Sequence, residues 1–271
     1  MPVTWVLEAN VFAHRCFDEM VAHLRHRGLP HHVVRIVPFS HEVSGEVPMV
    51  ENPCVVYGSI GVAKLAVKQG WFPGSWSSEE LSCTEYARQL KDLYLNRELI
   101  VCRLSEAEMR ADGLGWENFF IRPNSDGKAF PGGVVSRSYI ADCVSQMRST
   151  GLLEENDVEV VLAPQQETGR EWRTVIVGEN ITAFSLYRSH QRRWEERSIE
   201  PEALIAVQEA VKRFRPTEVF VVDVCETRDG MKIIEYNNFN TAGLYDCEVA
   251  AVIDSISERV ESNPNPQRSS G

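Results

Sequence analysis

Residues 219–240 read Val-Phe-Val-Val-Asp-Val-Cys-Glu-Thr-Arg-Asp-Gly-Met-Lys-Ile-Ile-Glu-Tyr-Asn-Asn-Phe-Asn, and they form the most specific pattern in the chain. Two apolar runs flank Arg228-Asp229-Gly230, a triplet typical of a three-residue hairpin loop with a left-handed glycine. In that register Asp223 lies directly opposite Glu235, whereas a two-residue loop would make the alignment diagonal. The stretch therefore predicts an antiparallel hairpin that holds two carboxylates side by side.

Asn237 follows Glu235 by two residues, so its side chain shares a face with both carboxylates. Two carboxylates directly opposite each other repel unless a cation lies between them, and a bare charge at the end of an apolar strand is costly. Carboxylate and amide oxygens suit Mg²⁺ that is bound together with nucleotide phosphates. We therefore predict a magnesium site at Asp223, Glu235 and Asn237.

An earlier hairpin is predicted over residues 171–185, with its turn at Gly178. Strand alternation places Glu171 and Arg173 on one face. By itself such a pair is equally consistent with an ion pair on a solvated face of a sheet.

Residues 119–133 combine a strand with a glycine-rich loop. The strand brings Arg122 to the mouth of the loop, and Lys128 lies inside it. Two cations and several freely turning backbone amides suit a polyphosphate, although no Walker A sequence is present. Taken alone, this segment is also consistent with a plain solvated loop.

The apolar strand Val158–Pro164 breaks at its proline. The break leaves the backbone of Leu162 and Ala163 available to hydrogen-bond a planar group. By itself, such a strand end does not indicate a particular ligand; it is informative only together with the neighbouring segments.

The first third of the chain alternates strands and helices. Strands are expected over Val3–Leu7, residues 32–37 and Cys54–Tyr57, with helices over residues 13–24 and 60–68. This alternation is typical of a parallel α/β sheet, and ligands of such sheets bind at the carboxyl ends of strands. The turn at Gly58 and Ser59 is therefore a candidate substrate edge, although a tight turn without a ligand has the same sequence.

The order of these segments resembles the ATP-grasp superfamily of carboxylate–amine ligases, over roughly residues 97–258. Most members of that superfamily have lysine where Arg122 stands. Arginine at that position, a lysine further into the loop, Glu171-Trp172-Arg173 and Glu235-Tyr-Asn237-Asn-Phe239-Asn240 are similar to a clade seen often in phage and bacterial genomes.

The resemblance implies α/β and α+β architecture. A Rossmann-like pre-ATP-grasp domain is expected over residues 1–96, an ATP-grasp domain of two α+β subdomains over 97–260, and a disordered tail over 261–271. It also implies ATP and Mg²⁺ as cofactors. The implied reaction phosphorylates a carboxylate of an amino acid, peptide or protein, and an amine then attacks the acyl phosphate to give an amide.

Residue roles follow from the same resemblance. Those implied are Arg122 on the α- and β-phosphates, Lys128 on the β/γ side, the backbone of Leu162 and Ala163 on adenine, Glu171 on ribose, Asp223, Glu235 and Asn237 on Mg²⁺, and Arg173 and Arg188 near the γ-phosphate or the substrate carboxylate. Gly58, Ser59 and Asn240 are further candidates for substrate contact. The arginine that usually stands shortly before the first metal carboxylate is absent, because Val221 and Val222 occupy those positions. The group that stabilises the acyl phosphate is therefore unassigned.

Composition narrows the class of protein. The 271 residues contain 28 Lys and Arg and 39 Asp and Glu, so the net charge is 28 − 39 = −11, which argues against broad binding to nucleic acid. No apolar run is long enough to span a membrane, and the seven cysteines show no C-x-x-C spacing, so a cytoplasmic protein with reduced thiols is expected. Two alternatives stay open: an ATP-binding sensor or scaffold without ligase activity, and a ligase for a nucleic-acid-linked substrate. Related ligases often form dimers, so a homodimer is also open.

Overall fold

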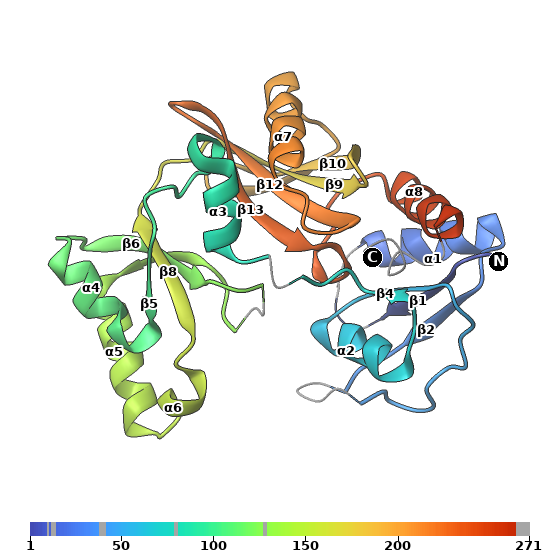
Figure 1. The fold of residues 1–271 in the computed structure, drawn as a ribbon, viewed down its shortest axis with the longest axis horizontal. Helices are drawn as coiled ribbons and strands as arrows, with labels where there is room; N and C mark the ends of the chain where they lie inside the picture. The colour runs from blue at the N-terminus through green and yellow to red at the C-terminus, as the bar shows by residue number, and fades with distance from the viewer. Residues whose placement is uncertain (10, 12–14, 38–41, 79–80, 127–128, 264–271) are drawn as a thin grey trace, which may run out of the picture.

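The structure is a computed structural model that describes residues 1–9, 11, 15–37, 42–78, 81–126 and 129–263 (Figure 1). Three sheets, each with its own helices, make up this part of the chain. No helix in the described ranges is both long and apolar enough to cross a bilayer.

The N-terminal part is a parallel sheet with strand order β2-β1-β3-β4. Its elements are β1 (Thr4–Glu8), α1 (Arg15–Arg27), β2 (His31–Val34), β3 (Cys54–Tyr57), α2 (Ile60–Gln69) and β4 (Pro73–Gly74). The predicted alternation of strand and helix is confirmed. Helix α2 begins where the Ser59 hydroxyl accepts from the Gly61 amide, and it ends at Gly70, which has a φ of 66°.

The middle part is an antiparallel sheet with strand order β5-β8-β6-β7. Its elements are β5 (Ile100–Arg103), η2 (Leu104–Glu106), α4 (Ala107–Gly113), β6 (Asn118–Pro123), β7 (Gly133–Ser136), α5 (Arg137–Ser149), α6 (Leu153–Asn156) and β8 (Glu159–Pro164). Helices α4 and α5 pack beside each other against this sheet (Figure 1). The core between them contains only residues of this part, such as Phe119 and Leu162.

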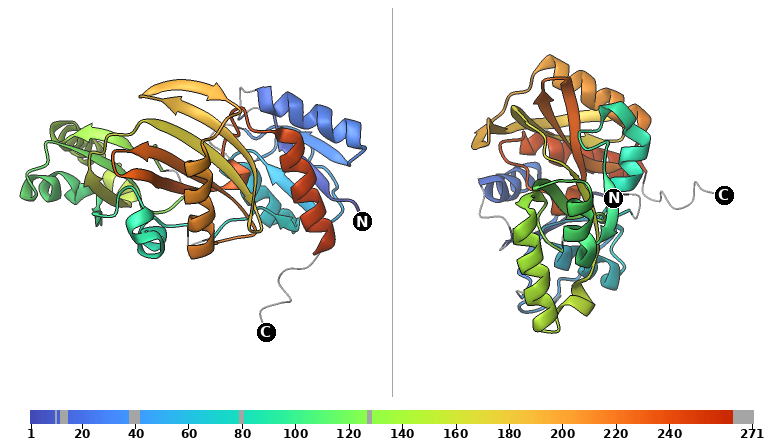
Figure 2. Two further views of the ribbon diagram at one scale, coloured as in Figure 1. Left: turned by 90° about the horizontal axis from the view of Figure 1, so that it is seen from above. Right: turned by 90° about the vertical axis from the view of Figure 1, so that its left-hand side faces the viewer.

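The C-terminal part is a larger antiparallel sheet with strand order β11-β10-β9-β12-β13. Its elements are β9 (Arg170–Val177), β10 (Asn180–Ser189), β11 (Arg192–Glu196), α7 (Pro201–Arg213), β12 (Val219–Thr227), β13 (Gly230–Asn238), η3 (Phe239–Thr241) and α8 (Val249–Ser262). Both expected hairpins are present. Figure 2 shows the large sheet from above, with α7 lying across it.

The two faces of the large sheet have different neighbours. On one face, alternate residues such as Trp172 share a core with α7. On the other face, Arg173 and Asp223 lie in a cleft, whereas Val175 and Val221, further along the same strands, pack into the core of the N-terminal part. One face of one sheet therefore serves as cleft wall at one end and as core at the other.

In the hairpin of β12 and β13, Asp223 pairs with Glu235 as expected, but the loop and the register differ from the prediction. Its loop has two residues, Arg228-Asp229, so the predicted three-residue loop is wrong. That register alone would oppose Asp223 to Ile234 and turn Glu235 toward the buried face. A β-bulge makes Ile234 an extra residue, and Asp223 consequently pairs with Glu235, as predicted.

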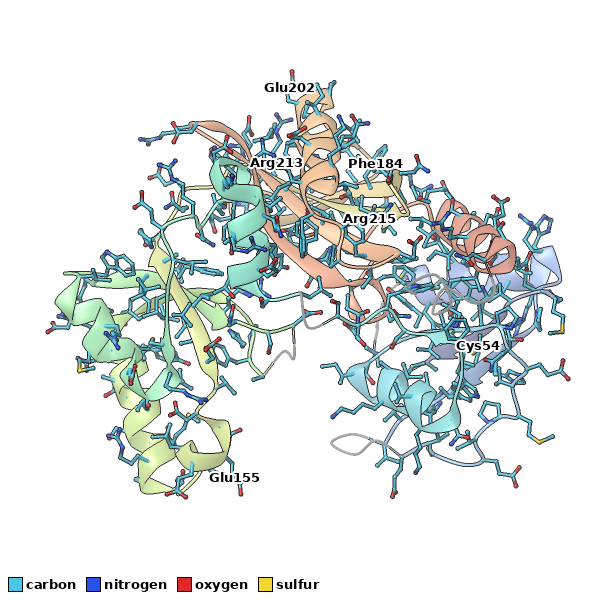
Figure 3. All side chains as sticks on the ribbon, viewed as in Figure 1. Cys54, Glu155, Phe184, Glu202, Arg213 and Arg215 are labelled. Carbon is cyan, nitrogen blue, oxygen red and sulfur yellow. The ribbon has the colours of Figure 1, made fainter. Side chains whose placement is uncertain are left out.

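Two helices cross the domain limits expected from the sequence. Helix α3 (Cys83–Leu90) and the 3₁₀ turn η1 (Lys91–Leu93) precede residue 97 but pack with α7. Arg213 at the end of α7 (Figure 3) donates to the Leu90 carbonyl oxygen at 2.8 Å. At the other limit, α8 packs on α1 and extends to Ser262, and residues 264–271 of the expected tail lie outside the described residues.

Candidate active site

A cleft of about 510 Å³ separates the middle sheet from the large sheet. Strand β6 and the segment that follows it form one wall, and strands β9, β10, β12 and β13 with the loop at Tyr245 form the other. The cleft brings together seven of the residues predicted from the sequence: Arg122, Glu171, Arg173, Arg188, Asp223, Glu235 and Asn237.

Asp223 is held by Arg173 from the neighbouring strand. The two residues are register partners of β12 and β9. Arg173 donates from Nε to Oδ1 at 2.9 Å and from Nη2 to Oδ2 at 2.7 Å, a bidentate pair in which both side chains are buried. A third donor, Nη1, reaches the Gly243 carbonyl oxygen at 2.8 Å. The guanidinium group is therefore fixed in one orientation beside the carboxylate.

Glu235 is held by Arg122 from the middle sheet. Arg122 Nη1 lies 2.5 Å from Glu235 Oε2 and also donates to the Tyr86 hydroxyl at 3.2 Å. Asn237 Nδ2 donates to the other carboxylate oxygen, Oε1, at 2.9 Å. The Arg122–Glu235 pair thus bridges the cleft and joins its two walls.

The two carboxylates titrate differently because their partners differ. Burial is the main cause that raises the pKa of Asp223 to about 6; the neighbouring Glu235 adds to it and Arg173 opposes it. Burial also opposes ionisation of Glu235, but Arg122, the Asn237 amide and Arg173 together lower its pKa to about 2. The two carboxylates therefore titrate as an interacting pair, with burial raising the pKa of one and the surrounding donors lowering the pKa of the other.

These four side chains form a neutral set, with two carboxylates and two guanidinium groups. The sequence predicted that the two carboxylates require a cation between them, and Arg173 Nη2 lies 2.7 Å from Asp223 Oδ2 and 3.9 Å from Glu235 Oε1. Nowhere in the described residues do three His, Cys, Asp or Glu side chains gather as a metal cluster. The donor set nevertheless suits Mg²⁺, because two carboxylates and the Asn237 amide line the same cleft; the metal would bind their oxygens in place of the arginine donors.

Glu171 and Arg188 form a second pair nearer the end of the large sheet. They are register partners of β9 and β10, and Arg188 Nη1 lies 3.4 Å from Glu171 Oε2. The Thr168 hydroxyl donates to Glu171 Oε1 at 2.9 Å. Glu171 is buried, whereas the Arg188 side chain is 46% exposed, so the arginine is the movable member.

A family model described as an ATP-grasp domain, the third family of its clade, matches residues 28–256. The chain belongs to this ATP-grasp family. The resemblance noted in the sequence is thereby confirmed, and so is the fold it implies. No protein of curated function matches the sequence.

Solved structures share the fold at low sequence identity. The RimK domain protein ATP-grasp from Sphaerobacter thermophilus DSM 20745 has a TM-score of 0.62 and 18% identity, over 94% of this chain and 99% of that one. D-cycloserine synthetase DcsG has a TM-score of 0.63 and 12% identity, over 95% and 99%. D-alanine–D-alanine ligase from Bacillus anthracis, solved with ATP, has a TM-score of 0.60 and 16% identity, over 98% and 100%.

Three other predicted residues lie elsewhere or outside the described chain. Leu162 and Ala163 are fully buried in β8, and they pair with Ile121 and Phe120 of β6. They do not line the ATP-grasp cleft, although Phe120 does. Lys128 lies outside the described residues.

The candidate substrate edge is occupied by internal hydrogen bonds. Ser59 donates from its backbone amide and its hydroxyl to Glu8 Oε2, at 2.8 and 2.6 Å. The Gly58 amide donates to the Asn240 carbonyl oxygen at 2.8 Å. The Asn240 side chain is fully buried: Oδ1 accepts from the Trp76 amide at 2.8 Å, and Nδ2 donates to the Val56 carbonyl oxygen. Asn240 thus joins η3 to the N-terminal sheet.

The cleft residues that the sequence did not single out include two tyrosines, Tyr187 and Tyr245. Their rings stack at 4.9 Å with an interplanar angle of 9°, and the Arg173 guanidinium lies 4.9 Å from the Tyr245 ring. Counted from the turn at Gly178, Tyr187 reaches the cleft face only when the β-bulges of β10, the first of which lies between Ile181 and Ala183, are known. Tyr245 lies in a loop and carries no sequence signal.

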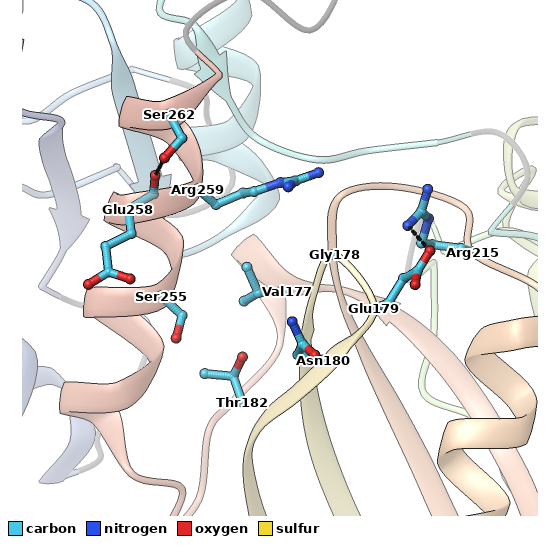
Figure 4. A pocket seen from close by; sticks show the side chains of 10 residues that line it. All are labelled: Val177, Gly178, Glu179, Asn180, Thr182, Arg215, Ser255, Glu258, Arg259 and Ser262. Atoms are coloured by element: carbon cyan, nitrogen blue, oxygen red, sulfur yellow. Dashed lines mark hydrogen bonds and ion pairs between the residues drawn. The ribbon is translucent and has the colours of Figure 1, made fainter.

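A separate surface hollow of about 480 Å³ lies between the β9–β10 turn and α8 (Figure 4). Its two arginines are already paired, Arg215 with Glu179 at 2.9 Å and Arg259 with Glu218 at 2.5 Å. We assign no chemistry to this hollow.

Removal of Arg173 tests the buried pair. Arg173→Met leaves Asp223 uncompensated, and we expect the free energy of unfolding to fall by about 3–5 kcal/mol in urea titrations. Adding Asp223→Leu should recover most of that loss, because neither charge is then buried alone. Arg215→Met, in an exposed pair, is the control and should cost less than about 1 kcal/mol. Additive losses in the double variant would contradict the pairing.

Asn240→Ala tests whether that side chain has a structural role. It leaves buried backbone groups of Val56 and Trp76 without partners, so we expect the free energy of unfolding to fall by about 3 kcal/mol. The exposed Asn118→Ala is the control and should unfold like the wild type. Unchanged stability together with a loss of substrate-dependent activity would instead favour substrate contact.

Proposed function

We propose that this chain is an ATP- and Mg²⁺-dependent carboxylate–amine ligase that forms an amide or peptide-like bond through an acyl phosphate. Membership of the ATP-grasp family supports the use of ATP. The observation that carries the proposal is the neutral set of Asp223, Glu235, Arg122 and Arg173 at the centre of the cleft. At one place in the cleft, such a set provides carboxylate oxygens that can bind metal ions and N–H groups that can bind phosphates.

Each side chain would take the part that its chemistry suits. Asp223, Glu235 and Asn237 would hold one or two Mg²⁺ ions, and Arg122 would move from Glu235 to the α- and β-phosphates. Lys128 would act on the β/γ side and Glu171 on the ribose hydroxyls. Leu162 and Ala163, which are buried in β8 and do not line the cleft, are not assigned to adenine. Magnesium bound there would neutralise charge on the phosphates.

Arg173 is the group that we assign to the acyl phosphate. No arginine precedes Asp223 in β12, but Arg173 reaches the same position from the adjacent strand β9. After its bonds to Asp223 and Gly243 its guanidinium group still carries N–H bonds for an oxyanion. Arg188, half-exposed at the rim, would meet the γ-phosphate or the substrate carboxylate. Catalysis would then consist mainly of positioning and of charge stabilisation.

The direct test combines binding and turnover. Wild-type protein should bind Mg-ATP in calorimetry and release ADP and phosphate when amino acids or peptides are supplied. Asp223→Asn should lower turnover by about a hundredfold or more, because one metal carboxylate is lost. Binding without any turnover across acids and amines would favour a sensor function, and an absence of Mg-ATP binding would refute both.

The arginine pairs make metal binding depend on the nucleotide. Without phosphates to accept Arg122, a metal ion must compete with its guanidinium group for Glu235. We expect AMPPNP to raise Mn²⁺ affinity by about tenfold or more, measured as free Mn²⁺ by electron paramagnetic resonance. In Arg122→Met, Mn²⁺ alone should bind and should raise the melting temperature. Arg110→Met, in an exposed pair with Glu106, is the control. Equal Mn²⁺ affinity with and without AMPPNP in the wild type would contradict this coupling.

A further inference from the structure

Tyr245 has a left-handed backbone, with a φ of 52°. A bulky residue rarely adopts this conformation, and glycine, the usual occupant, stands two residues earlier. Packing on both sides imposes it. Leu244 and Cys247 are buried in the core of the N-terminal part, and the Cys247 amide donates to the Leu244 carbonyl oxygen at 3.0 Å. The Asp246 amide donates to the Ser185 hydroxyl oxygen at 3.2 Å. Retained strain of this kind is a mark of functional positions.

The strained turn directs the Tyr245 ring into the cleft. There it stacks on Tyr187, and the Arg173 guanidinium lies 4.9 Å from one ring and 5.7 Å from the other. Because Arg173 is itself anchored on Asp223, the position of this aromatic wall is tied to the metal carboxylates. Burial raises the pKa of both tyrosines, so the wall carries no charge of its own.

Two cations already occupy the surroundings of the wall. Besides Arg173, the Arg188 guanidinium lies 5.9 Å from the Tyr187 ring. Both arginines are paired with carboxylates, Arg173 with Asp223 and Arg188 with Glu171, but they already make the cation–π contacts that these rings offer, so a third cation would have to displace one of them. A neutral apolar or aromatic group would instead gain contact area with the rings.

We propose that Tyr245, supported by Tyr187, determines which carboxylic acid the ligase accepts, favouring acids whose side chain is apolar or aromatic and rejecting those with a cationic side chain. This inference rests on the proposed ligase function, since it assigns the wall to the acid that is phosphorylated beside Arg173. Tyr245 would contact the side chain of the substrate and take no part in proton or phosphoryl transfer.

The test compares acids that differ only at the carboxyl-terminal residue. Free amino acids and glycyl-dipeptides ending in phenylalanine, leucine, lysine or arginine are titrated into protein saturated with Mg-AMPPNP, and thermal stabilisation is read. Wild type should respond to phenylalanine or leucine at about tenfold lower concentration than to lysine or arginine. Tyr245→Ala should lose this preference while its AMPPNP affinity is unchanged, and Tyr245→Phe should keep it. Tyr139→Ala, an exposed tyrosine of α5, is the control.

The outcomes separate this inference from the proposed function. A wild type that does not bind Mg-AMPPNP refutes the proposed function itself. If AMPPNP binds but no acid of the set stabilises the protein, if cationic acids bind equally well, or if Tyr245→Ala keeps the preference, the assignment of the wall is wrong. A parallel loss of AMPPNP affinity in Tyr245→Ala would also overturn it, by placing the ring in the nucleotide site.

A glycine variant distinguishes backbone strain from ring contact. Tyr245→Gly should melt at a higher temperature than Tyr245→Ala, because glycine adopts the left-handed conformation without strain, yet it should lose the preference to the same extent. A glycine variant that melts no higher than the alanine variant would show that the turn is unstrained and would remove that support.

Discussion

The cleft depends on one electrostatic constraint: two carboxylates that face each other on adjacent buried strands must be compensated. Asp223 and Glu235 meet this constraint in different ways, one through a partner in the same sheet and one through a partner across the cleft. The first pair joins β9 to β12 through side chains and fixes the Arg173 guanidinium beside the carboxylate. The second connects the large sheet to the middle sheet, whose buried residues form a core cluster of their own apart from Val161 of β8. A single requirement for neutrality thus determines both the local order of the site and the way its walls meet.

Much of this could be predicted from the sequence because it depends on short-range patterns. Alternation located the strands, and glycine with its flanking residues located the turns. The pairing of Asp223 with Glu235 was predicted correctly from an incorrect loop, since a two-residue loop and the bulge at Ile234 together restore the register. A bulge depends on how a strand packs on both faces, which is long-range information. Tyr187 could not be predicted for the same reason, because the face of β10 on which it lies depends on bulges in that strand.

Other features could not be predicted because they arise between segments that are distant in the chain. Arg173 was expected near phosphate, but its bidentate contact with Asp223 requires β9 and β12 to be neighbours, and 50 residues separate the two side chains. Asn240 lies in the stretch that resembles the family motif, yet its side chain accepts from the Trp76 amide and so connects η3 to the N-terminal part. Tyr245 combines a loop position with a conformation that its residue type disfavours, so local preferences predict against it.

The packing of α8 on α1 has a consequence for how the molecule moves. Strand β1 packs against helix α8, where Trp5 Nε1 donates to the Ser257 hydroxyl oxygen at 3.1 Å. The core that they share also includes Val175 and Val221 of the large sheet. The N-terminal and C-terminal parts are therefore one continuous body. The middle sheet has a core cluster of its own, but Val161 of β8 packs in the core of the large sheet, and the Cys83 amide at the start of α3 donates to the Asn124 carbonyl oxygen at 2.8 Å. Any movement of the middle sheet against that body would therefore have to break these contacts together with the Arg122–Glu235 pair.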